Sequence, residues 1–167
     1  ELCAELNTFV DNRLLDDDGT VMIRYKGGAR CLLSASQVFA GGENGLYIRV
    51  YGEKGGLEWR QDSPNTMIFR PIEGVAEMIR TSTPSVVSPA AAHNSRVPGG
   101  HPEGYIEAFA NLYRNFALTL MADIANETPD ELCLDFPNVR DGVAGMLFVQ
   151  KVVESSKQNA SWVKWED

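Results

Sequence analysis

The stretch PGGHPEGYIEAFANLYRNF, residues 98–116, opens on glycine and continues as an amphipathic pattern. Pro102 suits a first helical turn, where its missing N–H costs nothing, and Glu103 beside it favours the helix dipole. The apolar residues that follow recur in steps of three and four, which puts them on one stripe of a long helix. A stripe this wide needs an apolar floor, and we expect the preceding strands to supply it. Its members are Tyr105, Ile106, Phe109, Leu112, Tyr113, Phe116, Leu120, Met121 and Ile124.

The residues before this stretch alternate between apolar and polar side chains, a period typical of strands. Short glycine-rich and Asp- or Asn-containing turns separate the runs, and such connections favour antiparallel neighbours. The sequence therefore predicts a mostly antiparallel open sheet of about seven strands. The expected strands cover residues 2–10, 21–25, 29–38, 46–51, 57–60, 66–70 and 75–80.

A second helix is predicted from about Val139 to Ser156, with Asn138 as its cap and Asp141 completing a capping box. Its expected core stripe is Val139, Val143, Met146, Val149 and Val153, and Gly142 and Gly145 indicate close packing on a neighbour. Residues 81–100 show no periodicity and are expected to form a long loop. Residues 161–165 either add a short edge strand or pack down. Strands followed by helices predict an α+β fold with the helices on one face of the sheet.

Chain length and net charge exclude some classes of function. The 167 residues fit one domain, and Lys plus Arg number 15 against 23 Asp plus Glu, a net charge of −8. The absence of a basic cluster argues against a nucleic-acid partner. No apolar run reaches the roughly 20 residues of a membrane span. Three scattered cysteines, Cys3, Cys31 and Cys133, indicate reduced thiols and a cytoplasmic protein. The chain starts inside an alternating pattern, so we expect it to be part of a longer protein.

The chemistry-bearing residues are few. His93 and His101 do not have metal-ligand spacing, no serine has a G-x-S-x-G context, and no G-x-G-x-x-G occurs. We therefore predict no catalytic, cofactor-binding or metal-binding residue within this chain. His101 has two interpretations: a loop or helix-capping residue, or a polar residue lining a pocket. In the second interpretation Glu103, Tyr105 and Arg96 stand near it and bind substrate with it.

Three runs together carry a family resemblance. They are VYGEKGGLEW at residues 50–59, GGHPEGY with AFANLY at residues 99–113, and DFPNV with Asp141-Gly142 at residues 135–142. In this order they resemble the C-terminal domain of the Gfo/Idh/MocA oxidoreductases, over nearly the whole chain.

The resemblance implies a two-domain enzyme in which an N-terminal Rossmann domain, absent from this chain, holds NAD or NADP. This domain would then shape the pocket for a sugar, cyclitol or related polyol. The family's E-K-P lysine and D-x-x-x-H pair lie N-terminal to the matched region, and Glu53-Lys54-Gly55 lacks the proline. The isolated chain is thus expected to be inactive. A non-catalytic binding or oligomerisation module is the alternative.

The sheet's second face suggests self-association. If Leu46, Ile48 and Val50 point under the helices, then Tyr47, Arg49 and Tyr51 point away. Aromatic residues and Arg are favoured in interfaces, and the resemblance also implies assembly through this face. We predict a homo-oligomer, most simply a dimer, against the alternative of a solvated face.

Overall fold

The computed structural model describes residues 1–83 and 88–165. Its described part holds seven strands, three α-helices and one 3₁₀ helix, so the predicted α+β class and strand number are confirmed. The chain divides into two compact units, one formed by Glu1–Glu43 with Pro137–Asp167 and the other by Asn44–Phe136. Each unit is described by itself below.

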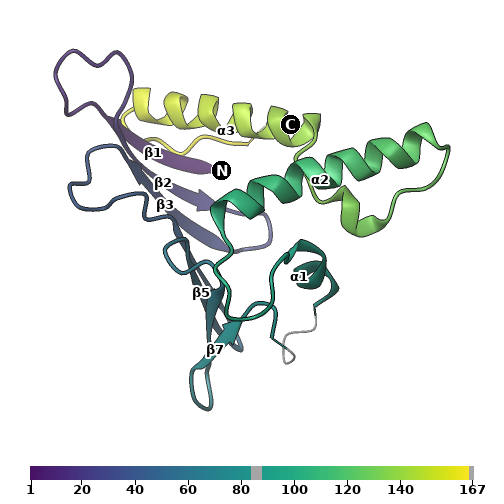
Figure 1. The fold of residues 1–167 in the computed structure, drawn as a ribbon. Coiled ribbons are helices and arrows are strands. Elements are labelled where there is room, and N and C mark those ends of the chain that lie inside the picture. The colour runs from purple at the N-terminus through teal and green to yellow at the C-terminus, as the bar shows by residue number, and fades with distance from the viewer. Residues whose placement is uncertain (84–87, 166–167) are drawn as a thin grey trace. The chain divides into compact units, whose positions relative to one another are not determined.

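The first unit is a three-stranded antiparallel sheet with one helix beside its edge. Strands β1 (Leu2–Asn7), β2 (Asp18–Arg24) and β3 (Arg30–Ser36) follow in chain order, and α3 (Val139–Lys157) packs on β1 (Figure 1). Alternation puts one side of each strand inward. The small core formed there consists of Leu2, Ala4, Val21 and Val152, with Leu6, Ile23 and Phe148 packed against it.

Two serines fix α3 to the edge of this sheet. The backbone N–H groups of Ala4 and Leu6, on the edge strand β1, donate to the hydroxyl oxygens of Ser155 and Ser156 at 2.8 and 3.1 Å. Ser155 is fully buried. Hydroxyl groups of the helix thus satisfy edge groups that would otherwise stay open to another strand.

The predicted core stripe of α3 is wrong for most of its members. Val139, Val143, Met146 and Val149 are exposed, and the inward face carries Val152 and Ser155 instead. The face with Val152 and Ser155 is turned inward because the buried N–H groups at the edge of β1 need hydrogen-bond partners, which the serines of α3 supply. Gly142 and Gly145 do not pack closely either, since a Cβ added at either position meets no atom within 4 Å.

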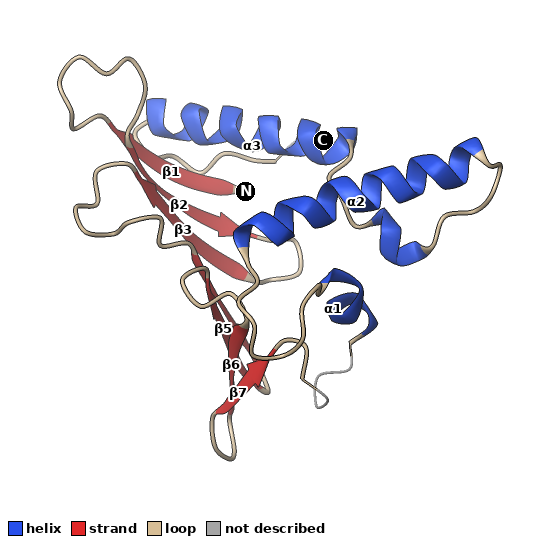
Figure 2. Cartoon of the chain, viewed as in Figure 1, coloured by secondary structure: helices blue, strands red, loops and turns tan. Residues whose placement is uncertain are grey.

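The second unit is a four-stranded antiparallel sheet followed by helical segments. Strands β4 (Tyr47–Gly52), β5 (Gly55–Arg60), β6 (Thr66–Pro71) and β7 (Glu77–Arg80) again lie in chain order. Helices α1 (Pro89–Asn94) and α2 (Tyr105–Ile124) and the 3₁₀ helix η1 (Glu131–Leu134) follow them (Figure 2). Helix α2 packs on η1.

The seven strands form two hydrogen-bonded sheets where the sequence predicted one open sheet. Residues 37–46 separate β3 from β4 and contain Gly41 and Glu43, whose φ angles are +78° and +50°. Left-handed backbone is incompatible with an extended ladder, so the chain turns there and the pairing stops.

The prediction that the apolar stripe of α2 packs on the strands is also wrong. All nine residues of its apolar stripe are exposed, as are Leu46, Ile48 and Val50, which were expected to lie under the helices. The buried residues of α2 are Asn111 and Asn115. Their amides bind residues 93–96 before the helix and Asp135 after it, and these directional hydrogen bonds place the polar face inward.

Two connections differ in detail from the sequence expectation. The predicted loop at residues 81–100 contains α1, capped by Ser88 with Pro89 in its first turn, while residues 84–87 of that loop lie outside the described residues. Residues 161–165 add one antiparallel bridge, in which Val163 and Leu2 exchange backbone hydrogen bonds of 2.8 and 2.9 Å. This isolated bridge is not a strand, and Val163 is buried, so the segment packs down beside β1.

Candidate functional site

An open groove of about 600 Å³ lies within the second unit, where α2 begins. One wall is the Gly100–Glu107 segment, and the other is the turn from Ser63 to Thr66 together with Arg80. Gly104 allows the close approach of these walls, because a Cβ there would lie only 2.8 Å from Cγ of Pro64. The groove brings together three of the four residues predicted to bind substrate: His101, Glu103 and Tyr105.

The backbone around His101 is fixed on both sides of the groove. The side-chain amide of Asn65 donates to the carbonyl oxygen of His101 at 2.7 Å, and the N–H of His101 donates to Pro98 at 3.2 Å. Nδ1 of His101 lies 3.1 Å from that same carbonyl oxygen of Pro98. A carbonyl only accepts, so Nδ1 donates in this contact.

The side chain of Glu103 binds the backbone of Arg96. One carboxylate oxygen of Glu103 accepts the N–H of Arg96 at 2.6 Å, and the other accepts the N–H of Val97 at 3.4 Å. The guanidinium of Arg96 donates to Asn111 and to the carbonyl oxygen of Ser95. Arg96 is therefore absent from the groove lining, and its described contacts connect the 95–97 segment to α2.

The first turn of α2 supplies an aromatic side chain and a carboxylate to the groove. Tyr105 is exposed, and its ring lies 4.9 Å from that of Phe109. The carboxylate of Glu107 accepts the N–H of Gly104 at 2.8 Å. This hydrogen bond, with a second from its own backbone N–H, lowers the pKa of Glu107 below its ordinary value. Glu107 is thus firmly ionised at neutral pH.

Sequence reasoning missed five polar residues of this groove: Ser63, Asn65, Thr66, Arg80 and Glu107. Ser63-Pro64-Asn65 precedes the predicted strand at residues 66–70, and Arg80 ends the predicted strand at residues 75–80. Arg80 donates to the hydroxyl of Thr66 at 3.3 Å, a cross-strand pair of β6 and β7. Only the pairing of these strands places them beside residues 100–107, so no local motif could have identified them.

The groove is lined by polar side chains of types that form hydrogen bonds with hydroxyl groups. It presents carboxylate, imidazole and amide groups together with a guanidinium and a phenol, and a hydroxyl can both donate to and accept from such groups. Concave sites with a few convergent polar groups are the usual form of small-molecule sites. Among the described residues that line the groove, no hydrogen bond joins a nucleophile to a base.

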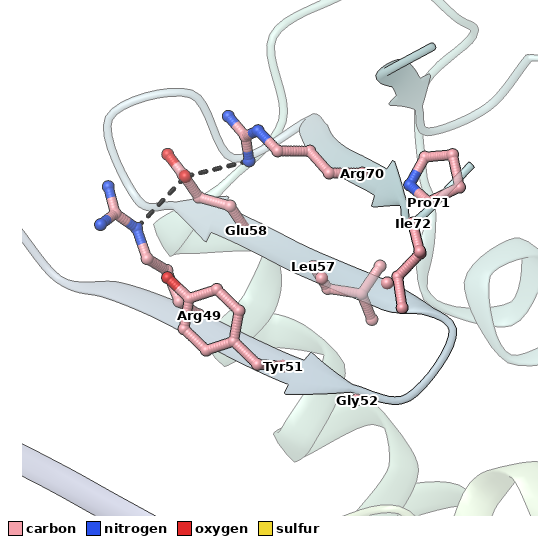
Figure 3. Close-up of a pocket in the computed structure, with 10 residues that line it drawn as sticks. Arg49, Tyr51, Gly52, Leu57, Glu58, Arg70, Pro71 and Ile72 are labelled. Carbon is pink, nitrogen blue, oxygen red and sulfur yellow. Dashed lines mark hydrogen bonds and ion pairs between the residues drawn. The ribbon is translucent and has the colours of Figure 1, made fainter. Parts of the chain in front are cut away.

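A second, smaller hollow of about 280 Å³ lies on the four-stranded sheet and includes Arg49 and Tyr51 (Figure 3). There Glu58 of β5 forms ion pairs with Nε of Arg49 and Nη1 of Arg70, both at 3.2 Å, on the two flanking strands. Figure 3 shows the carboxylate of Glu58 between the two guanidinium groups. The Glu58 side chain is only 16% exposed, whereas both arginines are about half exposed.

The remaining predicted interface residue, Tyr47, lies on the same sheet face. The guanidinium carbons of Arg49 and Arg60 each lie 5.5 Å from its ring centroid. Tyr51 is 79% exposed at the far end of β4. The predicted row of Tyr47, Arg49 and Tyr51 is thus a continuous, exposed and partly aromatic surface within this unit.

The starts of the two long helices are unfavourable for a dinucleotide pyrophosphate. The first turns of both long helices carry a carboxylate that accepts the N–H of the capping residue: Glu107 from Gly104 and Asp141 from Asn138. A pyrophosphate needs such amides free and would be repelled by the charge. Among residues 1–83 and 88–165 no three His, Cys, Asp or Glu side chains gather to hold a metal. No helix of this described part is long and apolar enough to cross a membrane.

Comparison with known proteins gives one consistent result. Residues 3–165 match the model of the Gfo/Idh/MocA oxidoreductase family, C-terminal alpha/beta domain. An oxidoreductase from Sinorhizobium meliloti is 42% identical with a TM-score of 0.91, the alignment covering 98% of this chain and 45% of that one. An inositol dehydrogenase homologue from Azotobacter vinelandii, solved with NADH and myo-inositol, is 32% identical with a TM-score of 0.86, over 98% and 43% of the two chains.

A curated relative agrees with the solved structures. The uncharacterized oxidoreductase YfiI of Bacillus subtilis is 28% identical over 99% of this chain and 42% of its own length. The chain therefore spans less than half the length of the relatives it matches.

Proposed function

This chain belongs to the Gfo/Idh/MocA family of oxidoreductases, as its C-terminal α/β domain, and we propose that it forms the polyol-binding wall of an NAD(P)-dependent dehydrogenase. In the full-length enzyme, the groove between residues 63–66 and 100–107 would receive a sugar, cyclitol or related polyol. His101, Glu103 and Tyr105 would contact its hydroxyl groups, with Asn65 and Arg80 beside them.

The single observation that carries this proposal is the composition of the groove. Its polar side chains converge from three separate segments, and most of them are held by hydrogen bonds to the backbone or to each other. Such preorganised donors and acceptors suit the alternating hydroxyl groups of a polyol. A relative with 32% identity was solved with myo-inositol, and that ligand belongs to the same chemical class.

In this proposal the cofactor binds to another part of the full-length enzyme. NAD or NADP would supply the hydride acceptor or donor, held by a nucleotide-binding domain outside this chain, because the helix starts of this chain do not fit a pyrophosphate. This chain's residues would bind the polyol and orient its reacting carbon. The three cysteines are free thiols, which agrees with a cytoplasmic enzyme.

Matched variants of the full-length enzyme test this role. His101→Ala and Tyr105→Phe should raise KM for myo-inositol at least several-fold, since each removes a hydrogen bond to substrate worth about 1 kcal/mol. KM for NAD⁺ should not change. Tyr113→Phe is the control, because Tyr113 is an exposed tyrosine on the same helix outside the groove. Equal effects of Tyr105→Phe and Tyr113→Phe would contradict the assignment.

We also propose that the sheet face carrying Tyr47, Arg49 and Tyr51 joins two copies of the protein. The exposed tyrosines and the arginine pair on Glu58 form a surface whose residue types are enriched in interfaces. A twofold contact would pair this surface with itself, the commonest arrangement in soluble oligomers.

A further inference from the structure

Two asparagines are buried on a helix whose large apolar side chains are exposed. Asn111 and Asn115 of α2 are 8% and 1% exposed, and they lie one helical turn apart on the same face. A buried amide costs free energy unless its donors and its acceptor are paired. Both amides are paired, and three of their four partners belong to the segment 93–96.

Asn111 connects this segment to the groove. Its Nδ2 donates to the carbonyl oxygen of Asn94 at 2.7 Å, and its Oδ1 accepts from the guanidinium of Arg96. The backbone N–H of that same Arg96 donates to Glu103, a residue of the groove. One side chain of α2 therefore binds the backbone of Asn94 and the side chain of Arg96, and the N–H of Arg96 in turn binds Glu103.

Asn115, one helical turn further along α2, also binds the segment that precedes the helix. Its Nδ2 donates to the carbonyl oxygen of Asp135 at 3.2 Å, which orients the amide, and its Oδ1 then faces Nε2 of His93 at 2.8 Å. Nε2 of His93 must carry the proton in this contact. The contact at 3.0 Å from Nη1 of Arg114 to Nε2 is then not a hydrogen bond, because both atoms are donors.

We propose that Asn111 is a positioning residue for the polyol groove. It holds the segment 94–97 on α2, and through the Arg96–Glu103 contact it sets the wall that carries Glu103 and His101. This inference rests on the proposed function for its kinetic consequence, while the positioning itself is a property of the domain. Hydrogen bonds are directional, so a clamp of this kind fixes an orientation that apolar packing would leave looser.

The structural test is hydrogen exchange in the full-length enzyme, with two variants that cut different contacts of α2. Asn111→Leu should accelerate amide exchange of residues 94–104 about tenfold, because it removes both clamp hydrogen bonds. Thr119→Val is the matched control: Thr119 donates to the carbonyl oxygen of Cys133 at 3.0 Å and holds η1 instead. It should accelerate exchange in residues 131–136 and leave 94–104 unchanged.

The kinetic test uses the same variants and one conservative change. Asn111→Leu should raise KM for myo-inositol about tenfold with KM for NAD⁺ within about twofold, since it disturbs only the polyol wall. Asn111→Asp keeps the acceptor for Arg96 but loses the donor to the carbonyl oxygen of Asn94, so it should raise KM for myo-inositol less than Asn111→Leu does. Thr119→Val should leave both KM values unchanged.

Three results would overturn the inference. They are equal exchange of residues 94–104 in wild type and Asn111→Leu, faster exchange without a change in KM for myo-inositol, and equal KM increases in Asn111→Leu and Thr119→Val. A wild-type enzyme with no activity on any polyol would refute the proposed function instead. The exchange comparison would then still decide whether Asn111 positions the segment.

Discussion

The hydroxyl oxygen of Ser155 lies 2.8 Å from the backbone nitrogen of Ala4, and Ser155 is fully buried. The same hydroxyl donates to the carbonyl oxygen of Ser161 at 2.6 Å. One side chain therefore connects α3 to the edge strand on one side and to the C-terminal segment on the other.

Replacement of Ser155 by Ala should lower the free energy of unfolding by about 1–3 kcal/mol, because it leaves the N–H of Ala4 buried without a partner. Chemical denaturation monitored by circular dichroism measures this. Ser156→Ala is the control: its hydroxyl accepts from Leu6 at 3.1 Å, and Ser156 is only half-buried, so its loss should be smaller. A Ser155→Ala variant within about 0.5 kcal/mol of wild type would contradict this role, because an unpaired buried donor costs more than that.

These polar contacts explain what the sequence could and could not predict. Period-two alternation located all seven strands, and the Asn138–Asp141 capping box located the start of α3. The buried faces of both long helices were predicted wrongly, because the apolar stripes were assumed to turn inward. Ser155 and Asn111 bury the other face through hydrogen bonds to distant segments, and periodicity does not report such partners.

In the candidate site too, residues close together in the sequence could be predicted, whereas those from distant segments could not. His101, Glu103 and Tyr105 lie close in sequence to a predicted helix start, and the structure places all three in one groove. Asn65 lies in the turn before β6 and Arg80 ends β7, and only the pairing of these two strands brings them there. Arg96 lies near Glu103 in sequence and in space, but its guanidinium points to Asn111, a contact that its position in the chain did not reveal.

The second prediction concerns acid stability of the first unit. Asp17 accepts the N–H groups of Phe9 at 2.8 Å and Val10 at 3.0 Å, and Arg13 lies 3.3 Å away. The hydrogen bond from Phe9 and then that from Val10 hold the pKa of Asp17 below its ordinary 3.8, against the opposing effect of desolvation. A lowered folded pKa means that the ionised carboxylate stabilises the folded state above pH 3.8 and loses this effect as pH falls below it.

Asp17→Asn should therefore be less stable than wild type at neutral pH, and the difference should shrink as the pH falls through and below 3.8. Denaturant midpoints measured from about pH 2 to about pH 7 give this comparison, because that span brackets the ordinary carboxyl pKa. Asp16→Asn removes an exposed charge from the same turn and serves as the control. A pH-independent difference between wild type and Asp17→Asn would contradict the linkage.

The third prediction is that the 167-residue chain alone does not bind a nicotinamide cofactor. Glu107 and Asp141 occupy the first turns of the two long helices, so neither helix start can accept a pyrophosphate. Titration of the chain with NADH and NADPH, followed by fluorescence, should show no saturable signal. Binding at micromolar concentrations would contradict the prediction and would place a cofactor site within this domain.

The fourth prediction concerns self-association through the four-stranded sheet. Light scattering at micromolar concentration should give a dimer mass, and Tyr47→Glu or Tyr51→Glu should split it, because each buries an unpaired carboxylate in the contact. Tyr25→Glu is the control, since Tyr25 is an exposed tyrosine in the hairpin between β2 and β3. A monomer mass that neither change at the sheet alters would favour a solvated face.

The polyol groove is tested most directly by the imidazole signals of the full-length enzyme bound to NADH. His93 and His101 are the two histidines of this chain, and their signals can be assigned by their loss in His93→Gln and His101→Ala. On titration with myo-inositol, we expect the His101 signal to shift in a saturable way and the His93 signal to stay, because His101 lines the groove and His93 binds Asn115. Saturable polyol binding that leaves the His101 signal unchanged would contradict the account.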